Sequence, residues 1–184
     1  RVGRALWPLQ MICADRMPLY LSGYVEDQKD TYSRALQEAQ KKLNYFPIIE
    51  FVCEAIVQSE VESKITRAVI EGLPNKWRDR AKFRSGSASF LALDVLQKRP
   101  IITSTILMDE LKLSKQVVST AINQLVERHI IRTRGKIGRT HIYAAEELIA
   151  LLSRRFGTSA DEALDSGYQA ILKQEPSVPS DKES

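Results

Sequence analysis

The sequence predicts a mainly α-helical protein that is built in two parts. From Arg4 to about Arg84, apolar residues recur at the spacing of helix faces. Residues 85–87 then read Ser-Gly-Ser, which is typical of a linker. Beyond the linker, the pattern indicates helix, helix, helix, hairpin and helix over about 70 residues. This is the element order of a winged helix-turn-helix domain with a small β-hairpin wing.

Composition limits the classes of protein to which the chain can belong. Its 184 residues can form one large domain or two small ones, and 43% of them are hydrophobic, which is enough for a core. The net charge of +4 permits an anionic partner without demanding one. No apolar run approaches the roughly 20 residues of a membrane span, so we expect no membrane partner. Cys13 and Cys53 match no metal-ligand spacing and lie in helical patterns, which predicts buried free thiols in a reducing, cytoplasmic compartment.

The first part is expected to contain several helices. One apolar stripe lies in "RALWPLQMICADRM" and another in "LYLSGYVEDQKDTYSRALQEAQ". A long helix then begins near Pro47, a residue that suits a first turn, and is expected to end at Gly72–Pro74. In the basic stretch that follows, Trp77 and Ala81 are expected to pack inward from a short helix while the charges stay solvated.

The second part begins with three predicted helices. The first, "ASFLALDVLQKRP", is ended by Pro100. The second follows Thr103, whose side chain suits an N-cap. The third follows Ser114, another cap residue, and its core stripe comprises Val118, Ala121, Ile122 and Leu125.

A hairpin and two further helices complete the second part. Apolar, β-branched residues flank a glycine-rich basic turn in "IIRTRGKIGRTHIYA", which predicts the hairpin. Residues 145–152 return to a helical pattern. Residues 157–184 are expected to form an acidic tail with one amphipathic helix and a disordered end.

Three stretches of the first part are similar to a known family. "RVGRALWPL", "PLYLSGYVEDQKDTYSRALQEAQ" and "YFPIIEFVCEAI" resemble, in order and spacing, the C-terminal part of a Fic (Fido) domain. The active-site motif of that family reads H-x-F-x-[DE]-G-N-G-R-x-x-R, so Arg1 matches its first arginine and Arg4 its last. The resemblance covers about residues 1–60. The second part resembles the winged helix that commonly follows the Fic domain in bacterial members, which implies a Fic-type bundle at 1–84, a winged helix at 88–156 and a tail at 157–184.

The resemblance implies a protein that transfers AMP from ATP to a hydroxyl group of a protein target. In the family, the histidine of the motif is the general base, the acidic residue holds Mg²⁺, and the glycine turn presents backbone N–H groups to phosphates. The arginines neutralise charge during attack at phosphorus. Arg1 and Arg4 are therefore implied to bind nucleotide.

The rest of that motif would lie ahead of Arg1 and is not in the sequence. We therefore expect the chain to be a fragment of a longer adenylyltransferase and to be inactive in AMP transfer. It is expected to hold no catalytic residue, metal ligand or cofactor of its own. ATP, Mg²⁺ and the protein target would belong to the longer protein.

The second part carries candidate DNA-binding residues. In a winged helix, the third helix enters the major groove and the wing contacts the DNA backbone. The face of that helix opposite its core stripe holds polar side chains suited to base edges and phosphates, namely Lys115, Gln116, Ser119, Thr120 and Asn123. Ser114 and Lys115, at the helix start, are candidates for a phosphate contact aided by the helix dipole. The cations of the wing, which are candidates for phosphate contacts, are Arg132, Arg134, Lys136 and Arg139.

Two positions depart from the winged-helix pattern, which usually has glycine where this chain has Lys112 and His129. Histidine tolerates a left-handed backbone, so His129 is expected to cap the third helix and not to act in catalysis.

A second hypothesis makes the chain an interaction module. The winged helix and tail would position protein targets or form a homodimer, and the amphipathic tail helix motivates this view. An independent enzyme is not expected, because the sequence shows no nucleophile–base pair, metal cluster or phosphate loop.

Overall fold

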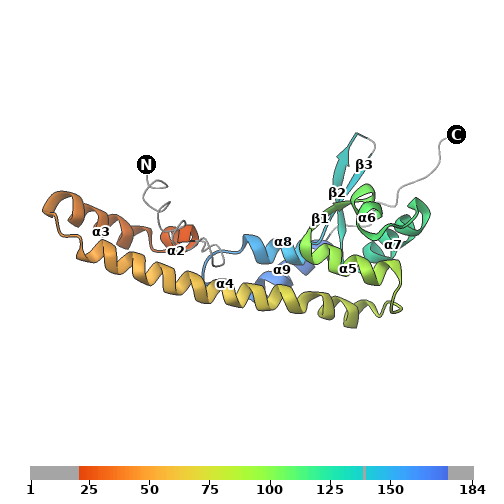
Figure 1. Cartoon of the computed structure of the whole chain (residues 1–184), viewed down its shortest axis with the longest axis horizontal. Coiled ribbons are helices and arrows are strands. Elements are labelled where there is room, and N and C mark those ends of the chain that lie inside the picture. Colours follow the sequence, from red (N-terminus) through yellow and green to blue (C-terminus); the bar gives the residue numbers. More distant parts are fainter. Residues whose placement is uncertain (1–20, 139, 174–184) are drawn as a thin grey trace. The chain divides into compact units, whose positions relative to one another are not determined.

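The computed structural model describes residues 21–138 and 140–173 (Figure 1). This part of the chain is mainly helical and contains a small three-stranded antiparallel sheet. Within the described ranges, the chain separates into two compact units, residues 21–67 with 155–158 and residues 68–154 with 159–173.

Helix α4 (Phe46–Ala81) is longer than the sequence predicts and contributes residues to both units. It continues through Pro74, so the expected helix end at Gly72–Pro74 is wrong. A proline has no N–H group, which leaves the carbonyl four residues earlier without its helical partner. Here that carbonyl belongs to Ile70, and Gln97 Nε2 donates to it at 2.9 Å. The side chain of Gln97 thus replaces the backbone hydrogen bond that Pro74 removes.

The last turns of α4 belong to the second unit because of what they bury. Leu73, Trp77 and Ala81 each expose 1% or less of their surface, inside the core of that unit. The inward packing expected of Trp77 and Ala81 is confirmed, although both lie in a long helix and not in a short one. The bundle expected at 1–84 is therefore divided, since residues 68–81 join the second unit.

The first unit combines the start of α4 with α2 (Leu21–Asp27) and α3 (Lys29–Lys42). Its small core is largely aromatic. The Tyr24 ring contacts those of Phe51 and Phe156, with centroids 5.5 and 5.4 Å apart. Leu21 and Ala55 complete the buried set.

Exposed apolar side chains mark another side of α4 in this unit. Phe46 exposes 71% of its surface, and four more side chains expose between 46% and 59%, namely Ile49, Val57, Val61 and Ile65. Cys53 is exposed as well, so the expectation of a buried thiol is wrong there. Phe51 and Ala55 face the core, and Cys53 lies two residues from each, which is about half a turn of helix. Cys53 therefore points away from the core.

The second unit adds five helices to the end of α4, and their existence confirms the predicted helices of this part. They are α5 (Ala88–Lys98), α6 (Ser104–Leu111), α7 (Lys115–Glu127), α8 (Glu146–Ser153) and α9 (Ala160–Leu172). Thr103 caps α6 as expected, because its side chain accepts the Ile106 N–H at 3.3 Å. Ser87, the last linker residue, caps α5 in the same way.

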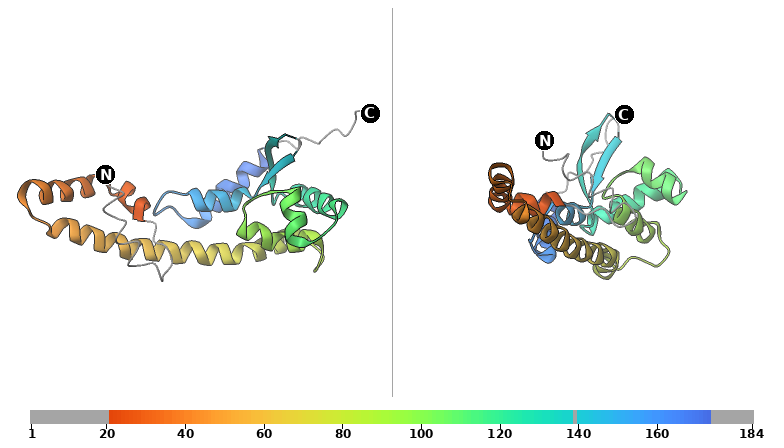
Figure 2. Two further views of the ribbon diagram at one scale, coloured as in Figure 1. Left: turned by 45° about the horizontal axis from the view of Figure 1, so that its top comes forward. Right: turned by 60° about the vertical axis from the view of Figure 1, so that its left-hand side comes forward.

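The sheet of the second unit has the strand order β1-β3-β2. Its strands are β1 (Ile101–Thr103), β2 (Arg132–Ile137) and β3 (Thr140–Ala144). The predicted hairpin is confirmed as β2 and β3, and Figure 2 shows it reaching beyond the helices of its unit. Strand β1 was not predicted, because three residues are too few for a recognisable alternation. Pairing shifts between Thr133 and Gly135, so Arg134 is the extra residue of a β-bulge.

Helix α9 is packed within the second unit and does not stand apart as a tail. Its contacts are mainly with α8, and its buried side is formed by Ala163, Leu164, Gly167 and Ile171. The predicted amphipathic helix is confirmed, and its apolar face is already covered by its own chain. The disordered end expected beyond it lies outside the described residues.

Candidate nucleic-acid interface

Helix α7 presents an exposed polar surface, here called the α7 face, which comprises Lys115, Gln116, Ser119, Thr120 and Asn123. The opposite side is the predicted core stripe, and its residues expose 3% or less of their surface: Val118, Ala121, Ile122 and Leu125. The helical period of 3.6 residues places Gln116, Thr120 and Asn123 on the side away from this stripe, with Lys115 and Ser119 at its border. The structure thus brings together the polar residues that the sequence predicted on this helix.

A turn of three residues, 112–114, joins α6 to α7. Lys112 adopts a left-handed backbone with φ of 55°, where glycine is more usual. Ser114 occupies the N-cap position with an extended backbone, but its side chain makes no cap hydrogen bond. Its hydroxyl group therefore stands beside Lys115 at the positive end of the helix dipole.

The far end of α7 is closed by His129, as the sequence predicted. His129 has φ of 54°, and its N–H donates to Val126 O while the Ile130 N–H donates to Leu125 O. These two bonds form a Schellman motif, in which glycine is the usual left-handed residue. His129 has a structural role at this end of the helix.

The wing between β2 and β3 has an exposed tip. Gly135, Lys136, Ile137 and Gly138 are all exposed, and Ile137 exposes 73% of its surface. Lys136 forms no ion pair with any described residue, so its charge is available. Arg139 lies outside the described residues.

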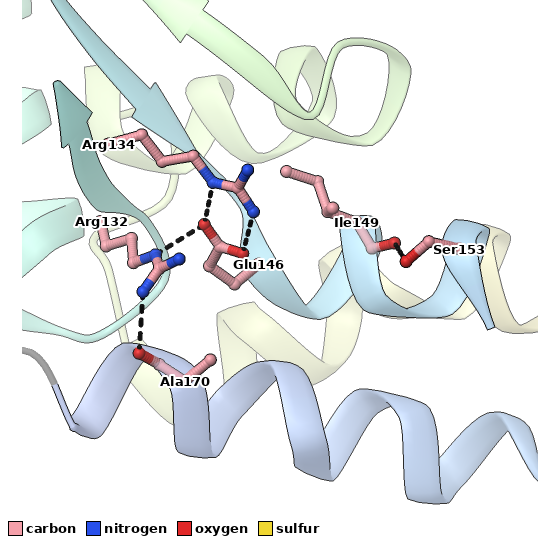
Figure 3. A network of polar contacts seen from close by, with 6 residues as sticks. All are labelled: Arg132, Arg134, Glu146, Ile149, Ser153 and Ala170. Atoms are coloured by element: carbon pink, nitrogen blue, oxygen red, sulfur yellow. Dashed lines mark hydrogen bonds and ion pairs between the residues drawn. The ribbon is translucent and has the colours of Figure 1, made fainter. Parts of the chain in front are cut away.

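The two other cations of the wing are held by a buried carboxylate (Figure 3). Arg132 Nε donates to Glu146 Oε1 at 2.6 Å, and its Nη1 donates to the carbonyl of Ala170 in α9 at 3.2 Å. Arg134 binds Glu146 through two bonds, from Nε to Oε1 at 2.6 Å and from Nη2 to Oε2 at 2.7 Å. Glu146 itself is only 4% exposed. Both guanidinium groups that the sequence assigned to phosphates are therefore paired with this buried carboxylate, although 42% of the Arg134 side chain stays exposed.

The surroundings of Glu146 keep it ionised. Burial alone would raise the pKa of Glu146, but hydrogen bonds from Arg134 and Arg132 outweigh burial and lower it below its usual value. The pKa of Arg134 is raised, first by its hydrogen bond to Glu146. Glu146 also lies in the first turn of α8, where the helix dipole favours a negative charge.

The next residue, Glu147, ties α4 to α8. Trp77 Nε1 donates to Glu147 Oε2 at 2.6 Å, and Arg80 binds the same carboxylate through both terminal nitrogens. The guanidinium group of Arg80 also lies 4.3 Å from the centre of the Tyr168 ring. Sequence reasoning missed both glutamates, because two acidic residues at a helix start are usually solvated.

Among the described residues, no second candidate site was found in the places that the sequence or its resemblance suggested. Arg1 and Arg4, the implied nucleotide-binding residues, lie outside the described residues. In residues 21–138 and 140–173, no group of three or more His, Cys, Asp or Glu side chains is arranged to hold a metal ion. No helix within those ranges is both long and apolar enough to cross a membrane. Neither a protein-family model nor a curated protein matches the chain.

Proposed function

We propose that residues 88–153 form a winged helix-turn-helix domain that binds duplex DNA in the cytoplasm. Helix α7 is its recognition helix, and the turn between β2 and β3 is its wing. The observation that carries the proposal is the α7 face, a polar and exposed surface on a helix whose other side is locked in the core. Such a helix can enter the major groove without disturbing the fold.

The element order supports the proposed domain. Helices α5, α6 and α7 are followed by β2, β3 and α8, with β1 inserted before α6. Strand β1 pairs with β3, opposite to β2, so the base of the wing is held by a third strand. The short turn at 112–114 matches the turn that gives the helix-turn-helix motif its name.

The phosphate contacts are assigned to side chains whose charges are not already paired. If Arg132 and Arg134 both turned fully towards phosphates, Glu146 would be left unpaired in a buried place, which is costly. Lys115 and Lys136 are exposed, and neither side chain has to leave a buried carboxylate in order to bind a phosphate. We therefore assign phosphate binding to Lys115, Lys136 and the hydroxyl group of Ser114.

The Lys136→Ala variant tests this assignment through the salt dependence of binding. Loss of one phosphate contact should weaken binding to all duplex sequences alike and reduce the slope of log affinity against log salt by about 1. Titrations of a labelled duplex at several salt concentrations measure both quantities. The control is Lys41→Ala, which removes the same charge from an exposed position on α3 and should change neither. Binding that ignores salt, or equal effects of the two variants, would count against the proposal.

We also propose, from the resemblance, that the first unit is the C-terminal part of a Fic-type domain. The DNA-binding domain would then be a regulatory part of an AMP-transferring protein that uses ATP and Mg²⁺. The support is the order and spacing of the stretches within residues 1–60. Calorimetry with ATP and Mg²⁺ tests the expectation that this chain is inactive. Micromolar binding, or transfer of AMP to a protein, would overturn it.

The alternative proposal is an interaction module that forms a homodimer. Helix α9 does not favour a homodimer, because its apolar face is buried within its own unit. What favours it is the exposed apolar side of α4 from Phe46 to Ile65. Sedimentation measures the mass of the chain in solution, and a monomer at micromolar concentration would reject this alternative.

A further inference from the structure

We infer that the α7 face distinguishes A·T from G·C base pairs, and that Gln116 and Asn123 make this distinction. The inference rests on the proposed function, because it concerns how the same face recognises DNA.

The two amide side chains are spaced along α7 at the scale of a few base pairs. Gln116 and Asn123 lie seven residues apart, which is about two helical turns and about 10 Å along the helix axis. They therefore share one side of α7, and their spacing corresponds to about three base-pair steps of duplex DNA. Both side chains are exposed.

Both amides are available for contacts outside the protein. Among the described residues, neither the Gln116 nor the Asn123 side chain makes a hydrogen bond. Gln124, on the same helix, is different because its Oε1 accepts from Ser89 Oγ at 2.5 Å. The amide of Gln124 is thus tied to α5, whereas Gln116 and Asn123 keep a donor and an acceptor free.

An amide side chain complements the major-groove edge of adenine. In the major groove, adenine offers an acceptor at N7 and a donor at N6, which a single amide can match with two hydrogen bonds. Guanine offers two acceptors, N7 and O6, which a guanidinium group matches and an amide carbonyl opposes. Helix α7 contains no arginine, and its one lysine, Lys115, lies at the helix start beside Ser114. The face is therefore suited to adenine.

Thr120 lies between the two amides along the helix and also favours A·T base pairs. Its hydroxyl group donates to the carbonyl of Gln116 at 3.1 Å, so the proton is used within the helix. What remains for a base edge is a methyl group and oxygen lone pairs. A threonine methyl group is a known type of contact to the methyl group of thymine.

Competition binding with two duplexes of equal length, one rich in A·T and one in G·C pairs, tests the inference on the full chain at fixed salt. We expect the unchanged chain to prefer the A·T duplex. Gln116→Ala and Asn123→Ala should each reduce that preference by about 5- to 150-fold, the range for loss of one bidentate base contact. Replacing adenine by 7-deazaadenine, which lacks the N7 acceptor, should produce a similar loss. The control is Gln169→Ala, which removes an exposed amide from α9 and should leave the preference unchanged.

The outcomes separate this inference from the proposed function. Equal affinity for both duplexes, or a preference that survives both alanine variants, would overturn the inference and leave DNA binding standing. Failure to bind either duplex would overturn both. A shift of preference towards G·C pairs in Gln116→Arg would support the role of Gln116, because a guanidinium group matches guanine. An unshifted preference in that variant would contradict it.

Discussion

Replacing Glu146 with alanine is expected to lower the free energy of unfolding of the second unit by about 3 kcal/mol, the lower part of the range for breaking a buried ion pair. The lower part applies because Arg132 and Arg134 keep 25% and 42% of their side chains exposed and can regain some water. Urea denaturation followed by circular dichroism measures the change. The control is Glu71→Ala, which removes an exposed glutamate from α4 and should cost about 0.5 kcal/mol or less.

The effect of Glu146→Ala should also depend on pH, and the direction follows from the pKa. The folded-state pKa of Glu146 is lowered, so its contribution to stability is complete above the unfolded value of about 4.3. That contribution is lost as the pH falls through the folded-state pKa. The difference between the variant and the unchanged chain should therefore shrink in acid. A small difference at neutral pH, or one that grows in acid, would contradict the role given to Glu146.

Replacing Gly167 with alanine is expected to lower the free energy of unfolding by about 2–3 kcal/mol, because a side chain there overfills a packed contact. An added Cβ would lie 2.6 Å from both Glu146 O and Glu147 Cα, and backbone atoms cannot move aside as a flexible side chain can. The variant should push α9 away from the start of α8, which carries both glutamates. Thermal unfolding and urea titration both measure the loss.

Gly72 provides a matched control for Gly167→Ala. Gly72 is also a helical glycine, but an added Cβ at that position meets nothing within 4 Å. Gly72→Ala should stabilise the chain by up to about 1 kcal/mol, since alanine is the better helix former. If the two substitutions change stability in the same direction and by similar amounts, the result would contradict the close packing of Gly167 against the backbone of α8.

The second part of the fold was largely predictable because its signals are local. The core stripe of α7 repeats at the helical period, and Thr103 stands directly before a helix that it caps. The hairpin was recognisable from β-branched residues around a glycine-rich turn. His129 was predictable as a helix end, because few residue types other than glycine tolerate its backbone conformation.

The features that sequence reasoning missed depend on partners that are distant in the chain. Helix α4 passes through Pro74 because Gln97, from another helix, satisfies the carbonyl that the proline leaves free. The rule that proline ends a helix considers only the local sequence, so it cannot anticipate a hydrogen bond from a distant residue such as Gln97.

The same limitation explains the assignment of the wing cations. From the sequence alone, Arg132 and Arg134 look like solvated charges on a basic hairpin. The structure pairs both with Glu146, and Arg132 also with Ala170 in α9. Among the described wing residues, Lys136 is therefore the one cation of the predicted set without an ion pair, and the polar residues of the α7 face are exposed as the sequence predicted.

The most direct test of the central claim, that the α7 face contacts DNA, is to compare duplex affinity of the Ser119→Glu and Ser166→Glu variants. Both serines are exposed on helices of the second unit, and both substitutions add one negative charge. A carboxylate at position 119 would enter the major groove between the negatively charged DNA backbones. Like charges brought together cost several kcal/mol, so affinity should fall at least about tenfold. Ser166→Glu on α9 should change it little. Equal affinities of the two variants, measured at one salt concentration, would contradict the claim.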